Sequence, residues 1–150
     1  MEPTNEPLAF SDTLSAEEEE AITQRLTAFN LAHSGAPWSA PMEPQPVQVA
    51  VRDAAGNLVG GLIGTSHAIP YWLTVSVIWV DERVRGQGAG SELMRRAEAI
   101  ARQRGCRYAR LATSQYQAPG FYTKLGYSEY GRLDDCPPGE TVYYFRKNLT

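Results

Sequence analysis

The chain has 150 residues, 43% of them hydrophobic and 21% charged, an ordinary composition for one globular domain with its own core. The formal net charge is −3 and acidic residues crowd Glu17 to Glu20, so we expect neither nucleic acid nor a membrane surface as a partner. The sequence shows no secretory leader pattern and no apolar run long enough to span a membrane. A cytoplasmic location is therefore expected.

Residues 1–14 are rich in proline, glutamate, asparagine and threonine, which predicts a flexible N-terminus in which residues 8–10 form a short edge strand. Ser15 and Glu18 have the spacing of a capping box, so a helix is expected to begin near Ser15 and to end by about His33. With no internal repeat and no second composition type, residues 15–150 are expected to form a single domain.

Four prolines between Pro37 and Pro46 predict a loop without regular structure. Valines then alternate with polar residues over 47–51, and after a turn a second strand is expected over 58–65, which predicts an antiparallel hairpin. Glycines in the second strand indicate a bulge or the close approach of another backbone; they are Gly60, Gly61 and Gly64.

The pattern at the centre of the sequence predicts a strand, a glycine turn and a helix. Residues 71–80 are mostly apolar and β-rich, which predicts a central strand buried on both faces. A helix is expected from about Gly88 to a C-terminal glycine at Gly105, followed by a strand over 107–113 that runs parallel to the central strand. A short helix over 119–125 and a terminal hairpin complete the chain; the hairpin strands are expected at 127–133 and 141–147.

The glycine turn has the chemistry of a phosphate site. Gly86, Gly88 and Gly90 let a ligand approach the backbone, and the unpaired N–H groups of the next helix favour an anion. A Rossmann fingerprint would need a third glycine at Ser91, and a P-loop would need a lysine that the turn lacks. Both nucleotide-binding patterns are therefore excluded.

Two blocks carry a family resemblance. The first is Arg-Gly-x-Gly-x-Gly over 85–90 after an apolar strand, and the second is the segment QYQAPGFYTKLGY over 115–127. Together they resemble the pyrophosphate loop and the later aromatic segment of the GCN5-related N-acetyltransferases (GNAT), and the resemblance covers about residues 47–148. It implies an α+β (α/β/α) fold with a central mixed, mostly antiparallel sheet. A parallel, splayed strand pair would lie at its centre, with helices on both faces.

The resemblance also implies a binding site for acetyl-CoA as co-substrate. The pantetheine arm would lie between the two splayed strands, and a main-chain N–H near Val80 would polarise the thioester carbonyl. Gln115, which stands where the family often has asparagine, would contact the arm. The implied cofactor-binding residues are Ile78, Trp79, Val80, Arg85, Gly86, Gln87, Gly88, Ala89, Gly90, Ser91, Gln115 and Tyr122.

Tyr122 is the implied catalytic residue, since the family places a tyrosine here to protonate the departing thiolate of CoA. The alternative is that Phe121 and Tyr122 are helix aromatics that pack on the sheet, a role that fits Phe121 better. The base that deprotonates the amine is left open between Asp81, Glu82 and water.

Several further residues bear on the acceptor and on other chemistry. The resemblance implies a carboxylate at the positions of Ser76 and Ala112, which are small and neutral here. Lone histidines and well-separated cysteines predict structural or surface roles and no metal site; they are His33, His67, Cys106 and Cys136. Acceptor-lining candidates are Trp38, Met42, Tyr71 and Tyr116, although Trp38 can equally cover the edge of the core.

The resemblance therefore predicts an enzyme that transfers an acetyl group from acetyl-CoA to a primary amine of a small molecule or peptide by direct attack. A catalytically silent acyl-CoA-binding sensor is the alternative, which the neutral residues at Ser76 and Ala112 allow. A nucleotide-binding module is disfavoured by the glycine spacing. Self-association into a homodimer, and a longer acyl donor, are left open.

Overall fold

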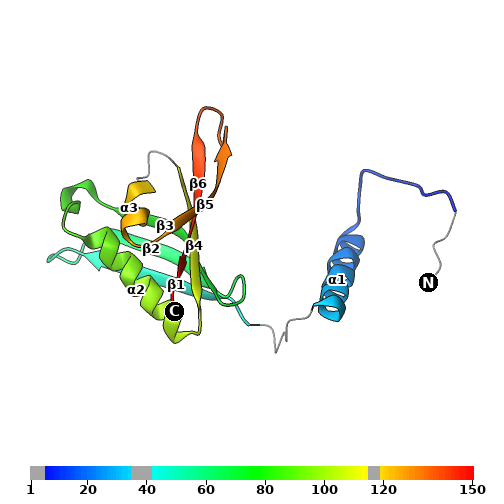
Figure 1. The fold of residues 1–150 in the computed structure, drawn as a ribbon, viewed down its shortest axis with the longest axis horizontal. Helices are drawn as coiled ribbons and strands as arrows, with labels where there is room; N and C mark the ends of the chain where they lie inside the picture. The colour runs from blue at the N-terminus through cyan, green and yellow to red at the C-terminus, as the bar shows by residue number, and fades with distance from the viewer. Residues whose placement is uncertain (1–5, 35–41, 115–118) are drawn as a thin grey trace. The chain divides into compact units, whose positions relative to one another are not determined.

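The computed structural model describes residues 6–34, 42–114 and 119–150, and it divides into two compact units, residues 1–40 and 41–150 (Figure 1). The expected single domain over residues 15–150 stays a prediction. The first unit contains helix α1, Ala16–His33. The Ser15 side chain accepts from the N–H of Glu18, and the Glu18 carboxylate accepts from the N–H of Ser15, so the predicted capping box is present.

The second unit contains a six-stranded sheet and the remaining helices. In chain order its elements are β1 (Gln45–Arg52), β2 (Leu58–Ser66), β3 (Trp72–Val80), the 3-10 helix η1 (Glu82–Val84), α2 (Ala89–Gln103), β4 (Tyr108–Ser114), α3 (Pro119–Lys124), β5 (Ser128–Asp134) and β6 (Thr141–Asn148). The elements predicted in this unit are confirmed to within a few residues at each end. The strand predicted at residues 8–10 is wrong, because that segment has no regular structure.

The strands lie in the order β1-β2-β3-β4-β6-β5. β3 and β4 are parallel and every other neighbouring pair is antiparallel, so the predicted mixed sheet with a central parallel pair is confirmed. Helix α2 supplies the crossover that a parallel pair requires.

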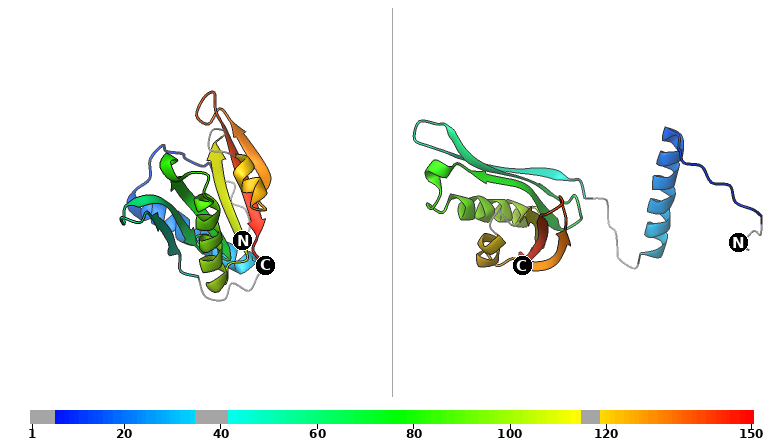
Figure 2. Two further views of the ribbon diagram at one scale, coloured as in Figure 1. Left: turned by 90° about the vertical axis from the view of Figure 1, so that its left-hand side faces the viewer. Right: turned by 90° about the horizontal axis from the view of Figure 1, so that it is seen from above.

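Helices α2 and α3 cover one face of this sheet, and Figure 2 shows α2 lying along it. Leu93, Met94 and Ala97 of α2 are buried in a single core with Leu62 and Leu73 of the sheet. The burial of this helical face accounts for most of the hydrophobic stabilisation that positions α2. The predicted helices on the opposite face stay a prediction.

The glycines of β2 are required by close contacts with β3. A Cβ atom at Gly64 would lie 2.6 Å from the carbonyl oxygen of Thr74, and one at Gly60 would lie 2.9 Å from that of Trp79. Both distances are shorter than a side chain tolerates, so the predicted close approach of another backbone is confirmed.

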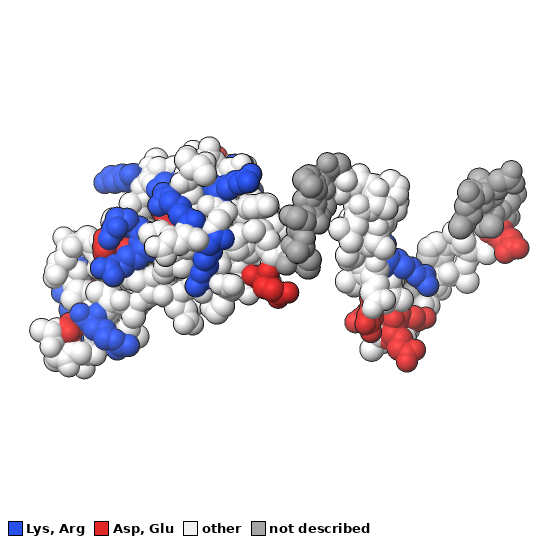
Figure 3. Space-filling model, turned by 90° about the horizontal axis from the view of Figure 1, so that it is seen from below, with Lys and Arg blue, Asp and Glu red and all other residues white. Residues whose placement is uncertain are grey.

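The charges are divided unequally between the two units. Residues 1–40 contain seven of the 17 acidic residues but one of the 14 basic residues, so residues 41–150 carry a net positive charge. Figure 3 shows Lys and Arg side chains spread over one face of the second unit and acidic side chains gathered on α1. The negative charge of the whole chain therefore does not describe the second unit, and the absence of a nucleic-acid partner stays a prediction. None of the helices in the described residues is both long and apolar enough to span a bilayer.

Candidate active site

The parallel strands β3 and β4 separate part of the way along their length. Their ladder runs from the pair Trp72–Tyr108 to the pair Val75–Leu111. β3 continues to Val80, and no described residue of β4 pairs with it beyond Val75. A cavity of about 550 Å³ lies at this separation, lined by both strands and by Tyr122. The splayed pair therefore leaves a slot in the middle of the sheet.

The pairing of β3 with β2 determines where the main-chain groups of β3 point. The N–H of Asp81 donates to the carbonyl oxygen of Val59 at 2.8 Å, so these two residues form a hydrogen-bonded pair. Because hydrogen-bonded and non-hydrogen-bonded pairs alternate in an antiparallel ladder, Trp79 is bonded to β2, whereas Ile78 and Val80 are not. The N–H and C=O groups of Ile78 and Val80 therefore point into the slot.

A bulge in β3 produces this orientation. Ile63 faces Val77 and Gly64 faces Val75, which leaves Ser76 as an extra residue without a partner on β2. A bulge shifts the alternation of the strand by one residue and increases its local twist. It lies where the ladder with β4 ends, so it also helps to separate the two strands.

The predicted glycine turn joins the slot to α2. Gly86 and Gly88 have φ angles of 81° and 76°, a left-handed conformation that favours glycine, and Gly88 is the N-cap of α2. No side chain caps this helix, so the first-turn N–H groups of Ala89, Gly90 and Ser91 have no partner within the helix. A Cβ at Gly86 or Gly88 would meet nothing within 4 Å, so the turn is open to a ligand.

Gly90 has a different role from the two glycines before it. A Cβ at Gly90 would lie 3.2 Å from the ring of Phe121, so its absence lets this ring pack against the first turn of α2. A second cavity of about 460 Å³ lies between Phe121 and the glycine turn. It shares five lining residues with the slot; they are Ile78, Trp79, Val80, Arg85 and Tyr122. The two cavities therefore form one continuous cleft from the slot to the N-terminus of α2.

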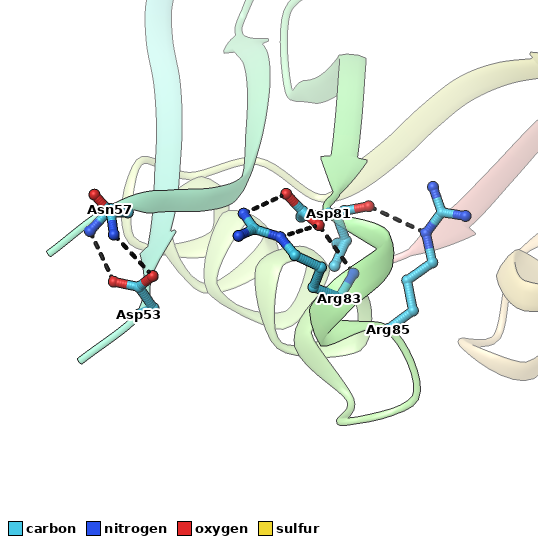
Figure 4. A network of polar contacts seen from close by, with 6 residues as sticks. Asp53, Asn57, Asp81, Arg83 and Arg85 are labelled. Atoms are coloured by element: carbon cyan, nitrogen blue, oxygen red, sulfur yellow. Dashed lines mark hydrogen bonds and ion pairs between the residues drawn. The ribbon is translucent and has the colours of Figure 1, made fainter. Parts of the chain in front are cut away.

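The charged residues between β3 and α2 have distinct partners (Figure 4). Asp81 binds Arg83 with both carboxylate oxygens, at 2.8 and 3.0 Å, and it accepts the Arg83 N–H that begins η1. These hydrogen bonds from Arg83 lower the pKa of Asp81 to about 2. Arg85 instead reaches back toward the cleft, and its Nε donates to the carbonyl oxygen of Val80 at 3.1 Å. Asp81 and Glu82 are not among the described residues that line either cavity.

Tyr122 lies at the junction of the two cavities and its side chain is 5% exposed. Its ring packs against three aromatic rings, with centroid distances of 5.0 Å to Phe121, 6.2 Å to Tyr127 and 6.0 Å to Phe145. Burial raises the pKa of the Tyr122 hydroxyl, so the group remains protonated at neutral pH. A neutral phenol in a cleft can donate a proton to a basic atom that forms there.

The structure brings most of the predicted site residues to this cleft. Gln87 lies in the turn but does not line either described cavity, whereas Ser76 and Ala112 line the slot. Trp38, Gln115 and Tyr116 fall outside the described residues. Met42 lies in the segment before β1, and Tyr71 precedes the opposite end of β3 from Val80, so neither lines the cleft.

The predicted structural roles of the histidines and cysteines fit the structure. His67 is buried, and its Nδ1 accepts from the N–H of Tyr71, so its Nε2 donates to the carbonyl oxygen of Arg104 at 2.7 Å. Cys106 is buried with its sulfur 3.8 Å from His67 Nε2, and Cys136 is half-buried. His33 closes α1 with a bond to the carbonyl oxygen of Phe29.

Sequence reasoning missed two features, the bulge at Ser76 and the ion pair between Glu98 and Lys147. Glu98 and Lys147 are 49 residues apart in the sequence, and their contact could not be found from local spacing. A signal for it did exist, because a glutamate on the apolar face of an amphipathic helix needs a buried partner.

Comparisons with known proteins agree with this geometry. Residues 11–127 match the model of a family described as the acetyltransferase (GNAT) family. The chain is 43% identical to a blasticidin-S acetyltransferase of Streptomyces morookaense over 112 residues, which cover 72% of this chain and 81% of that protein. It is 33% identical to an acetyltransferase of Agrobacterium fabrum over 140 residues, which cover 93% and 97% of the two chains.

The crystal structure of an acetyltransferase from Bacillus cereus ATCC 14579 superposes on the chain with a TM-score of 0.76 and 33% identity, over 93% of this chain and 97% of that one. The cleft, the glycine turn and these matches agree on an enzyme that uses acetyl-CoA as acyl donor. The chain belongs to the GNAT acetyltransferase family.

Proposed function

We propose that this enzyme transfers the acetyl group of acetyl-CoA to a primary amine of a small molecule, by direct attack of the amine on the thioester. The observation that carries the proposal is the continuous cleft that runs from the first turn of α2 to the slot between β3 and β4. It offers an anion site at the first turn of α2 and a neutral phenol, Tyr122, at the junction of the two cavities.

The cleft fits the two chemical parts of CoA. The open turn at Gly86 and Gly88, with the unpaired N–H groups of α2, suits the pyrophosphate. The C=O of Ile78 and the N–H of Val80 suit the amides of the pantetheine arm, which would occupy the position that β4 leaves empty. Arg85 already satisfies the carbonyl of Val80, so Val80 would contribute mainly its N–H.

The order of Ile78, Val80 and the glycine turn along the chain refines the assignment of the oxyanion donor. The glycine turn follows Val80, so Val80 is nearer to the pyrophosphate and Ile78 is nearer to the closed end of the slot. We therefore assign the N–H that polarises the thioester carbonyl to Ile78 instead of Val80. One donor of this kind lowers the barrier by about 3 kcal/mol.

Tyr122 is assigned as the general acid. When the amine nitrogen bonds to the carbonyl carbon, the carbon–sulfur bond breaks and the sulfur leaves with the electron pair. The Tyr122 hydroxyl would supply the proton that this sulfur needs, and burial keeps the hydroxyl protonated until that moment.

Water is assigned as the base that takes the proton from the substrate ammonium before the amine attacks. Asp81 is a poor base because Arg83 holds its pKa at about 2 and occupies both of its oxygens. Glu82 is exposed, with an oxygen 3.8 Å from Arg85, and lies outside the lining of both described cavities. Water at the open mouth of the slot remains as the acceptor of the proton.

The acceptor is assigned to small-molecule amines on the basis of the Streptomyces morookaense relative, which is named for acetylation of blasticidin-S. Release of free thiol from acetyl-CoA is to be measured over a panel of blasticidin S, free amino acids, a polyamine and a peptide with a free N-terminus. We expect thiol release with at least one small amine, together with the N-acetylated product. Turnover of the peptide alone would overturn the small-molecule assignment.

Two binding measurements support this experiment. CoA is expected to raise the Tm of the protein, whereas ATP and NAD at the same concentration are not. A protein that CoA stabilises, but that releases no thiol with any amine of the panel, would contradict the proposed acceptor class. Equal stabilisation by ATP would contradict the assignment of the cleft to CoA.

A further inference from the structure

Glu98 is a buried carboxylate outside the lining of the two cleft cavities. Glu98 of α2 is 3% exposed, and its oxygens are 2.6 and 3.3 Å from Nζ of Lys147 on β6. The hydroxyl of Tyr127 donates to the same carboxylate at 3.4 Å, and Arg102 lies 3.9 Å from it. Three segments of the chain, α2, β6 and the residue before β5, therefore meet at one charge.

Tyr127 connects this charge to Tyr122. At the end of α3 the N–H of Tyr127 donates to the carbonyl oxygen of Tyr122 at 3.0 Å, and Gly126 between them has a φ of 92°. This is a helix stop in which the residue after the left-handed glycine packs against the last turn of the helix. The two rings meet edge to face with centroids 6.2 Å apart. The position of Tyr127 thus limits where the ring of Tyr122 can lie.

Lys147 holds the same segment from the other side. Its Nζ lies 5.6 Å from the centroid of the Tyr127 ring, and a Cβ at Gly126 would lie 3.5 Å from its Cε. Lys147 therefore lies over the Tyr127 ring and beside Gly126, while its charge is neutralised by Glu98. Burial and the negative charge of Glu98 raise the pKa of Tyr127, so its hydroxyl remains a donor to Glu98.

A buried ion pair of this kind adds little net stability compared with apolar residues, because desolvation offsets the attraction, but it can favour one arrangement over others. We propose, on the basis of the function assigned above, that the Glu98–Lys147 pair positions Tyr122 for proton transfer by fixing Tyr127 against α2. Glu98 is a positioning residue, since it acts through Tyr127 and lines neither of the two cleft cavities.

In this arrangement a single helix, α2, both binds the pyrophosphate of CoA and positions the proton donor. The first turn of α2 offers the N–H groups for the pyrophosphate, and Glu98, on its third turn, holds the segment that carries Tyr122. The proton donor then keeps a constant position relative to the CoA site. Proton transfer is sensitive to such a distance, and a misplacement of about 1 Å can cost up to about 100-fold in rate.

The test uses Tyr127→Phe, which removes one hydroxyl, and Glu98→Gln, which removes the charge and keeps the shape. The rate of acetyl transfer is measured in a single turnover with the best amine of the panel, beside the Kd of acetyl-CoA and the Tm. We expect each variant to lose about tenfold in rate, with the Kd of acetyl-CoA unchanged. Glu129→Gln is the matched control, since Glu129 is paired with Arg132 on the exposed side of β5, and its rate should equal that of the parent.

The decisive comparison repeats both substitutions in a Tyr122→Phe background. If they act through Tyr122, they cause no further loss there, because the hydroxyl that they position is gone. A tenfold loss in both backgrounds would show a general structural effect and overturn the inference, as would an unchanged rate in the Tyr122 parent. If Tyr122→Phe itself costs nothing, the acid assignment fails first and the inference fails with it, while the transferase activity stands.

Discussion

Val75 and Leu111 lie opposite each other as the last pair of the parallel ladder between β3 and β4. Beyond this pair the backbone of β3 keeps its bonds to β2 but faces an open slot on its other side. The proposed function depends on this relationship, because an open strand edge inside a sheet offers main-chain groups that a ligand can use.

Hydrogen exchange can test the use of this edge residue by residue. We expect acetyl-CoA to slow amide exchange at Ile78 and Val80, whose N–H groups face the slot, and to leave Trp79 unchanged, since its N–H is bonded to β2. The exchange rates can be followed by NMR with and without the ligand. Equal protection of all three amides would show that the ligand stiffens β3 as a whole. No protection of Ile78 and Val80 would show that the pantetheine arm does not bind along this edge of β3.

Gly88→Ala should separate ligand binding from backbone strain. Gly88 and Gly105 stand at the two ends of α2 with φ angles of 76° and 87°, and a Cβ at either would meet nothing within 4 Å. Alanine at each position should cost about 1–2 kcal/mol of folding free energy. Only Gly88→Ala should also weaken the binding of CoA, by about tenfold or more, because its Cβ enters the anion site. Calorimetric titration measures this, and equal Kd values for both variants would contradict the site.

The raised pKa of Tyr122 predicts a particular pH profile. Burial favours the neutral hydroxyl, so the acid remains available at every pH below the ordinary tyrosine value of about 10. The single-turnover rate at saturating amine should therefore not fall between about pH 7 and pH 9.5. Tyr122→Phe should lower this rate by about 10²- to 10⁴-fold, with the Kd of acetyl-CoA unchanged. A descending limb well below pH 10 that disappears in Tyr122→Phe would show that the pKa is not raised.

Gly64→Ala tests the bulge that shapes the slot. Its Cβ would lie 2.6 Å from the carbonyl oxygen of Thr74, so β2 and β3 must move apart at the bulge, at a cost of about 1–3 kcal/mol. We expect a lower Tm and weaker binding of CoA. Gly131→Ala on β5 is the control, since a Cβ there meets nothing within 4 Å, and its Tm should stay within a few degrees of the parent. An unchanged Tm for Gly64→Ala would contradict the tight approach of the two strands.

Much of the fold could be predicted from local patterns. The capping box at Ser15 and the glycine at Gly105 gave helix ends, and the strand-helix-strand order gave the parallel pair. The strand expected at residues 8–10 failed because three apolar residues carry no information about a partner strand.

The site could be predicted only where the chemistry is local. The turn at Gly86 and Gly88 has a spacing that can be read from the sequence, and it lies where expected. The choice between Ile78 and Trp79 could not be read in this way, because it depends on the hydrogen-bond register with β2 and on the bulge at Ser76. Similarly, the Glu98–Lys147 pair joins residues that only the folded sheet brings together.

The most direct test of the proposed function follows a labelled acetyl group. The protein is mixed with acetyl-CoA carrying ¹⁴C in the acetyl carbonyl, with and without the best amine of the panel, and label is counted in the acid-precipitated protein and in the amine. Direct transfer predicts that label enters the amine, with one thiol released per acetyl group, and that the precipitated protein stays unlabelled in both samples. Label in the precipitated protein would show a covalent acetyl-enzyme, and label in neither protein nor amine would contradict amine acetylation.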